Sequence, residues 1–137
     1  MTFSKVTKVG SLMIGTAAVS LLLALTAMPA VRAAGPCLSD ENKAQKVSGI
    51  LTIESKGNAK GSYILKLAAP ACLSTEDPDE KVAATRTIHV FSTDDAVLKR
   101  IASTTGKRIV VYGRPFAAHT RYHHAPIVMN VSAFEPG

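Results

Sequence analysis

The segment Arg86–Gly113, RTIHVFSTDDAVLKRIASTTGKRIVVYG, decides the fold, because it predicts a strand, a helix and a second strand in succession. Residues 86–91 and 107–113 are rich in β-branched and aromatic side chains, which favour strands. Between them, the hydroxyls and carboxylates of residues 92–95 can cap a helix and suit the positive end of its dipole. Gly106 would end this helix as a left-handed C-cap. The apolar face expected for the helix consists of Val97, Leu98 and Ile101.

Three further strands flank this segment. Residues 47–54 alternate apolar and polar side chains with a period of two, and residues 62–68 do the same until Pro70 ends the strand. The turn-forming residues 56–61 join these strands as a hairpin, and residues 127–134 form the last strand. The order β-β-β-α-β-β predicts a mainly β fold with one helix, a five-stranded OB-like barrel. Another small α+β meander is the alternative.

The N-terminus has the pattern of a secretory signal peptide. Lys5 and Lys8 precede an uncharged, apolar stretch, which ends in small residues around Ala33 and Ala34. We expect cleavage after Ala33, or else after Ala34, and no stable membrane anchor afterwards. The alternative is an uncleaved anchor, which Pro29 disfavours. The chain then divides into a signal peptide at 1–33, a lead-in at 34–46 and an OB-like domain at 47–137, with a periplasmic or secreted location.

Two cysteines remain after cleavage, Cys37 and Cys72. In an oxidising compartment an even pair predicts a disulfide. On the chain-entropy model, this loop closure stabilises the fold by about 3–4 kcal/mol. A redox role for the pair is the alternative.

Charge is distributed unevenly along the chain. Residues 34–95 hold 7 basic and 9 acidic side chains, whereas residues 96–134 hold 6 basic and no acidic ones. A positive half favours anionic partners such as acidic glycans, nucleic acid or an acidic protein surface. A generally basic, solvated surface explains the same numbers equally well.

The most unusual segment is the loop 114–126, RPFAAHTRYHHAP, which contains three of the four histidines. In an OB-like barrel this loop lies beside the usual ligand face. Tyrosine can stack on a ligand, and arginine can bind phosphate or carboxylate with two hydrogen bonds. The loop therefore predicts an exported binding module for an anionic or carbohydrate-like ligand or a protein partner. The expected ligand-binding residues are Arg114, His119, Thr120, Arg121, Tyr122, His123 and His124.

Three alternatives remain for the same loop. His119, His123 and His124 are candidate ligands for zinc or copper, since imidazole suits both metals. Two histidines with an arginine could also cleave a phosphodiester as a hydrolase, but no nucleophile motif accompanies them, so no catalytic residue is assigned. The loop could finally be structural. The binding hypothesis requires no cofactor, and His89 is expected to be an ordinary strand residue.

Two motifs resemble a family of small secreted bacterial proteins with a domain of unknown function. One is the strand Y-x-L-x-L-x-x-P-x-C at residues 63–72, and the other is Gly113 followed by Thr120 and by His123-His124-x-Pro126 at residues 123–126. The resemblance covers about residues 47–134 and implies the fold, export and the importance of the loop, but no activity. Members of that family commonly carry three consecutive histidines. Tyr122 occupies the first of these positions here, which argues against a metal triad and leaves a stacking or hydrogen-bonding loop.

Overall fold

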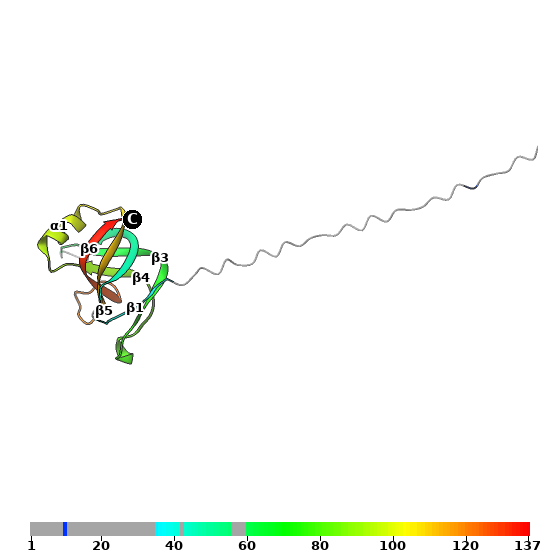
Figure 1. The fold of residues 1–137 in the computed structure, drawn as a ribbon, viewed down its shortest axis with the longest axis horizontal. Helices are drawn as coiled ribbons and strands as arrows, with labels where there is room; N and C mark the ends of the chain where they lie inside the picture. The colour runs from blue at the N-terminus through cyan, green and yellow to red at the C-terminus, as the bar shows by residue number, and fades with distance from the viewer. Residues whose placement is uncertain (1–9, 11–34, 42, 56–59) are drawn as a thin grey trace, which may run out of the picture. The chain divides into compact units, whose positions relative to one another are not determined.

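The computed structural model describes residue 10 and residues 35–41, 43–55 and 60–137 (Figure 1). Apart from Gly10, the predicted signal peptide therefore lies outside the described residues, as do Ala34 and residues 56–59 of the predicted turn. The elements of the described part are β1 (Cys37–Ser39), β2 (Gln45–Glu54), β3 (Ser62–Ser74), a 3-10 turn (Pro78–Glu80), β4 (Val82–Phe91), α1 (Asp95–Ala102), β5 (Arg108–Ala117) and β6 (Ile127–Pro136).

The described fold is mainly β with a single α-helix, as the sequence predicted. Its six strands form one sheet in the order β1-β3-β2-β5-β6-β4, and an additional β3–β4 pairing joins the pairings of β2–β6 into a ring. Strand β4 pairs with β6 in parallel, whereas the other pairs in this ring are antiparallel. The five predicted strands correspond to β2–β6, so the described strands number six rather than five.

The additional strand, β1, lies in the predicted lead-in. It pairs in parallel with β3, with Cys37 directly opposite Cys72. The two cysteines are joined by the predicted disulfide, and their Cα atoms are 4.4 Å apart. The lead-in is therefore held against the sheet both by backbone pairing and by a covalent bond.

Two strands continue past the residues that were predicted to end them. Strand β3 passes through Pro70, because its pairing with β4 is irregular between Lys66 and Ala71 and no ladder hydrogen bond is needed from the proline there. Strand β5 continues past Gly113 to Ala117, because β6 pairs with it up to Ile127. The prediction of a loop over residues 114–126 is thus wrong at its start, and the connection between β5 and β6 is residues 118–126.

Helix α1 begins where the sequence predicted. The side chain of Asp94 accepts hydrogen bonds from the backbone N–H groups of Ala96 and Val97, which caps the first turn. The helix ends at Ala102, before Gly106, although Gly106 does have a positive φ of 84°. Figure 1 shows α1 beside β6, and its buried side chains, Val97 and Ile101, join the core.

The hydrophobic core lies inside the ring of strands. It is formed by inward-facing residues of every strand in the ring, and its fully buried members include Leu51, Leu65, Ile88, Ile109 and Met129. The described part of the chain contains no helix of the length and apolar character needed to cross a bilayer.

Candidate functional site

A second set of buried and half-buried side chains lies on the outside of the sheet. Strand register aligns Ile64 of β3, His89 of β4, Val128 of β6 and Phe116 of β5 across four neighbouring strands. We call these four residues the outer row. They alternate along their strands with core residues, so they face away from the core. Ile64 and Val128 are nevertheless 0% exposed, so another part of the chain covers them.

Part of the cover is the connection between β5 and β6, residues 118–126, called here the 118–126 loop, because its histidine rings lie against Phe116 and His89. Its base is closed by a hydrogen bond of 2.9 Å from Ala118 N–H to the Pro126 carbonyl oxygen. Its far side is attached to the sheet, because His124 N–H donates to Nδ1 of His89 over 3.2 Å. Ala125 is buried as well, with 6% of its surface exposed. The loop is therefore packed against the outer row.

Imidazole rings provide much of this packing. The rings of His119 and His123 have centroids 4.8 Å apart, and those of His89 and His124 are 5.5 Å apart. The ring of His123 also lies 5.6 Å from that of Phe116 and 6.1 Å from that of His89. The four histidines thus form one connected group, the histidine cluster. His89 lies within β4, as expected, and it also contacts the loop histidines, which the sequence did not predict.

Hydrogen bonds fix the protonation of two of these rings. Nδ1 of His89 accepts from His124 N–H, and Nδ1 of His123 accepts from His119 N–H over 3.1 Å. A backbone N–H can only donate, so both Nδ1 atoms must carry a lone pair. Burial, followed by the nearby His124 and His123, lowers the pKa of His89. Burial, followed by His119 and His124, lowers the pKa of His123. Geometry and electrostatics both favour neutral rings.

This arrangement does not suit a metal ion. A neutral imidazole whose Nδ1 accepts a hydrogen bond carries its proton on Nε2, so His123 offers no free nitrogen. His119 differs, because its Nδ1 lies 3.2 Å from the Ala117 carbonyl and donates to it, which leaves Nε2 free. Nδ1 of His124 is buried without a partner among the described residues. Within those residues, no group of three or more His, Cys, Asp or Glu side chains could hold a metal ion, so the hypothetical triad of His119, His123 and His124 is not assembled.

The tip of the loop, Thr120–Tyr122, points away from this packing and is solvent exposed. Tyr122 is 67% exposed, which is unusual for a large aromatic residue. The Arg121 guanidinium lies 5.0 Å from the centre of the Tyr122 ring and donates a 2.8 Å hydrogen bond to its hydroxyl. Thr120 stabilises the turn by accepting from Tyr122 N–H at Oγ1 and from His123 N–H at its carbonyl oxygen. The tip thus presents a cation and an aromatic ring as one unit.

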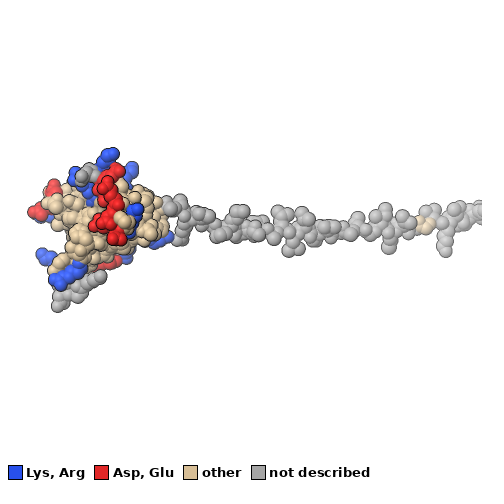
Figure 2. All heavy atoms as spheres, turned by 90° about the horizontal axis from the view of Figure 1, so that it is seen from below, with Lys and Arg blue, Asp and Glu red and all other residues tan. Residues whose placement is uncertain are grey.

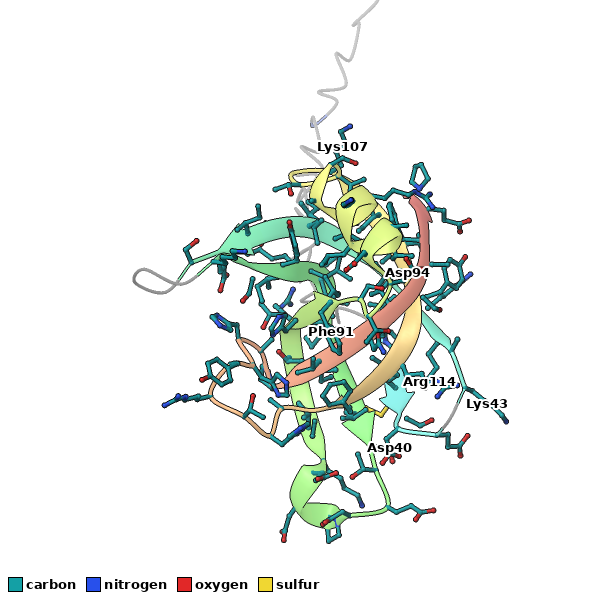
Figure 3. All side chains as sticks on the ribbon, turned by 90° about the vertical axis from the view of Figure 1, so that its left-hand side faces the viewer. Asp40, Lys43, Phe91, Asp94, Lys107 and Arg114 are labelled. Carbon is teal, nitrogen blue, oxygen red and sulfur yellow. A yellow bond between two sulfur atoms is a disulfide. The ribbon has the colours of Figure 1, made fainter. Side chains whose placement is uncertain are left out.

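Arg114 does not belong to this tip. It lies within β5, opposite Asn130 of β6, which in turn lies opposite Phe91 of β4 (Figure 3). Its side chain lines a separate pocket beside Asp94 at the start of α1. The seven predicted ligand residues therefore fall into three places, namely the histidine cluster, the tip and the Arg114 pocket.

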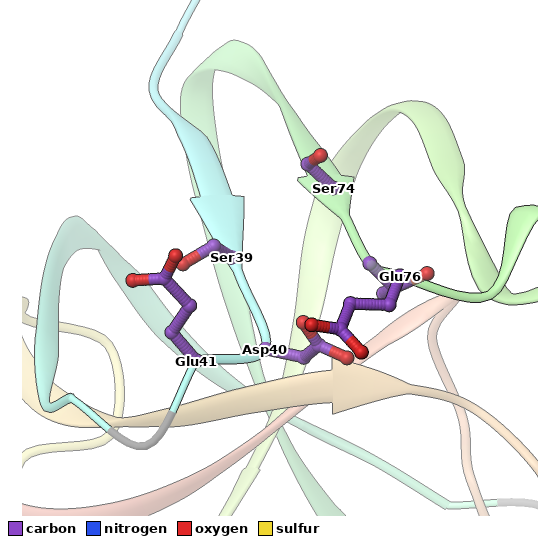
Figure 4. Close-up of a pocket in the computed structure, with 6 residues that line it drawn as sticks. Ser39, Asp40, Glu41, Ser74 and Glu76 are labelled. Carbon is purple, nitrogen blue, oxygen red and sulfur yellow. The ribbon is translucent and has the colours of Figure 1, made fainter.

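The acidic residues gather elsewhere, and Figure 2 shows a band of them across one face. Another pocket, of about 410 Å³, lies where β1 and β3 end, and Figure 4 shows the side chains of Asp40 and Glu76 pointing toward each other there. Both carboxylates are exposed to solvent. The lining of this pocket is thus opposite in charge to the Arg121 tip.

Comparison with known proteins gives a match to a family model and similarity to solved structures. The model of the family "Domain of unknown function (DUF4431)" matches residues 87–135. That match confirms the predicted resemblance to an uncharacterised family, and it spans the 118–126 loop and all four histidines. The crystal structure of a small single-stranded DNA-binding protein from Streptomyces coelicolor is similar with 14% identity and a TM-score of 0.35, over 69% of this chain and 93% of that chain. No curated protein matches the chain.

Proposed function

We propose that this chain is an exported OB-like binding module that binds an anionic ligand through the Arg121–Tyr122 tip. The observation that carries the proposal is the exposed, stacked Arg121–Tyr122 pair on a loop that is itself anchored to the sheet. A guanidinium recognises carboxylate, sulfate or phosphate oxygens with paired hydrogen bonds, while the tyrosine ring can stack on a sugar or another ring. Acidic glycans combine both features, so they are the ligand class we propose.

Because the loop is already anchored, binding a ligand should cost less conformational entropy than it would with a flexible loop. Ordering a flexible loop or a long side chain on binding costs free energy. Here the hydrogen bond from His124 to His89 and the turn at Thr120 hold the loop before any ligand arrives. Arg121 is also held by its bond to the Tyr122 hydroxyl.

Strand pairing supports the OB-like assignment. The ring β2–β3–β4–β6–β5 contains a parallel β4–β6 pair, and the helix falls between β4 and β5. Five strands with a helix between the third and fourth follow the OB order if β1 is counted as an addition. In that fold, ligands bind beside the second and third strands and the last loop, which here correspond to β3, β4 and the 118–126 loop.

Export is supported by the N-terminal sequence pattern and by the disulfide between Cys37 and Cys72, because such bonds persist in oxidising compartments. We therefore propose a periplasmic or secreted location, with the signal peptide removed after Ala33 or Ala34.

The test is a binding titration of the oxidised mature chain, residues 34–137, against a polyuronate, a sulfated polysaccharide and neutral dextran. Arg121→Gln and Tyr122→Ala should each weaken binding to an acidic polysaccharide by about tenfold, since each removes a charged or stacking contact. Lys99→Gln is the matched control, because Lys99 is an exposed cation on α1. Equal losses of binding affinity in Arg121→Gln and Lys99→Gln would show that binding depends only on the overall positive charge of the protein, and would refute the proposal. Equal binding of neutral dextran would refute the anionic ligand class.

A further inference from the structure

A second pocket, distinct from the tip, brings two unpaired opposite charges together. Its volume is about 360 Å³, within the range of small-molecule sites, and Arg114, Asp94, Asn130 and Thr93 are among the residues that line it. Among the described residues the one ion pair joins Lys66 and Glu54, so Arg114 and Asp94 do not form an ion pair across the pocket. Two such charges facing the same space are complementary to a ligand that carries both signs.

Some polar atoms around this pocket already make hydrogen bonds within the protein, and others are available to a ligand. Ser92 Oγ donates to the Val131 carbonyl over 2.7 Å and accepts from Asp94 N–H over 3.1 Å. These two bonds attach the segment before α1 to β6. Ser132 Oγ likewise donates to the Tyr112 carbonyl. The helix N–H groups are occupied too, because Oδ1 of Asp94 accepts from Ala96 and Val97. The second carboxylate oxygen of Asp94 and the Arg114 guanidinium remain for a ligand.

We propose that this pocket binds a free α-amino acid, with its carboxylate on Arg114 and its ammonium group on Asp94. Guanidinium binds carboxylate with two parallel hydrogen bonds, and a carboxylate oxygen accepts from an ammonium group in a charge-assisted bond. Asn130 supplies further polar atoms at the Arg114 side, since the two residues are directly opposite in the β5–β6 pairing. Ala44 also lines the pocket and, being exposed, provides apolar surface for a small side chain.

The nearest simple alternative is a pocket for any small anion. That alternative uses Arg114 alone, and Asp94 would then oppose binding by repulsion. The two possibilities differ in their response to the ligand's amino group, which can be added or removed chemically.

The experiment is an NMR chemical-shift titration of the mature chain with L-alanine, propionate and ethylamine. Propionate is alanine without its amino group, and ethylamine is alanine without its carboxylate. L-alanine should shift the resonances of residues around the pocket in a saturable manner, with both partial ligands binding at least about tenfold more weakly. Arg114→Gln and Asp94→Asn should each weaken alanine binding by a similar factor.

Two features keep this test interpretable. Asparagine caps helices as well as aspartate does, so Asp94→Asn removes the charge and retains the cap. Arg121→Gln at the tip should leave alanine binding unchanged, which separates this site from the acidic-glycan site. Propionate binding as tightly as alanine, alanine binding that survives in Arg114→Gln or in Asp94→Asn, or no saturable shift would each overturn the proposal.

Discussion

Lowering the pH from about 7.5 to about 5 should destabilise the protein through its histidine cluster. The folded chain lowers the pKa of His89 and of His123 below the usual value of 6.5. The unfolded chain has no such burial, so its histidines take up protons first as the pH falls. Stability contributed by the neutral rings is therefore complete above about pH 6.5 and declines below it until the pH passes the lowered folded pKa values.

Linkage sets the size of this effect. One proton bound only by the unfolded chain lowers the free energy of unfolding by at most about 1.4 kcal/mol per pH unit. Two histidines contribute at most about twice that slope, and solvent screens both rings because neither is fully buried. We therefore expect a total loss below that ceiling, which grows as the pH falls from about 6.5 toward the lowered pKa values. For a chain of about 100 residues, each 1 kcal/mol lost corresponds to a fall in Tm of roughly 4–8 °C.

The assay is urea unfolding of the oxidised mature chain at a series of pH values, for the wild type and for His89→Asn. The Oδ1 atom of asparagine lies close to the position of imidazole Nδ1, so it can still accept from His124 N–H but does not titrate. The variant should show a shallower decline of stability with falling pH. The protection of the His124 amide against hydrogen exchange, measured relative to the intrinsic exchange rate at each pH, should fall in acid in the wild type, because a protonated Nδ1 no longer accepts.

Equal pH slopes in the wild type and His89→Asn would refute a role for His89 in this linkage. Stability that rises as the solution becomes acidic would refute the neutral-ring argument altogether.

Three further outcomes follow from the described contacts. Zinc should produce no saturable rise in Tm at neutral pH, because a backbone N–H occupies Nδ1 of His89 and Nδ1 of His123. A rise in Tm that saturates at stoichiometric zinc would contradict that assignment. Leu65→Ala should lower the free energy of unfolding in urea by about 2–5 kcal/mol, because Leu65 is 0% exposed in the core. A loss below about 1 kcal/mol would show that this face of β3 does not pack in the core. Replacing Cys37 and Cys72 by serine should cost about 3–4 kcal/mol under oxidising conditions, and it should cost nothing further under strong reductant, where both proteins lack the bond.

Local sequence patterns predicted the order of the elements and the start of the helix. The alternation of residues 47–54 and the capping side chain of Asp94 depend only on near neighbours, so both are visible in one sequence. The ends of β3 and β5 depend instead on the strands beside them. Pro70 is accepted because the β3–β4 ladder is irregular there, and residues 114–117 are extended because β6 pairs with them.

The composition of the candidate site was predicted only in part. The sequence identified the histidines, arginines and tyrosine of the loop as unusual, but it offered no reason to join His89 to them or to pair Arg121 with Tyr122. That contact requires β4 and β6 to pair in parallel, with His89 opposite Val128, and the two strands are separated by the helix and by β5. Arg114 was grouped with the loop by its closeness in sequence, whereas strand geometry directs it to another pocket.

The separation between the covered outer row and the exposed tip affects how this molecule can diversify. The residues that attach the loop, such as His124 and Ala125, are not the residues that face solvent at Arg121 and Tyr122. Substitutions at the tip therefore alter the chemistry offered to a ligand while the contacts with β4 and β6 stay in place. A laboratory library restricted to residues 121 and 122 would sample new specificities on a constant scaffold, in the way that antibody loops do.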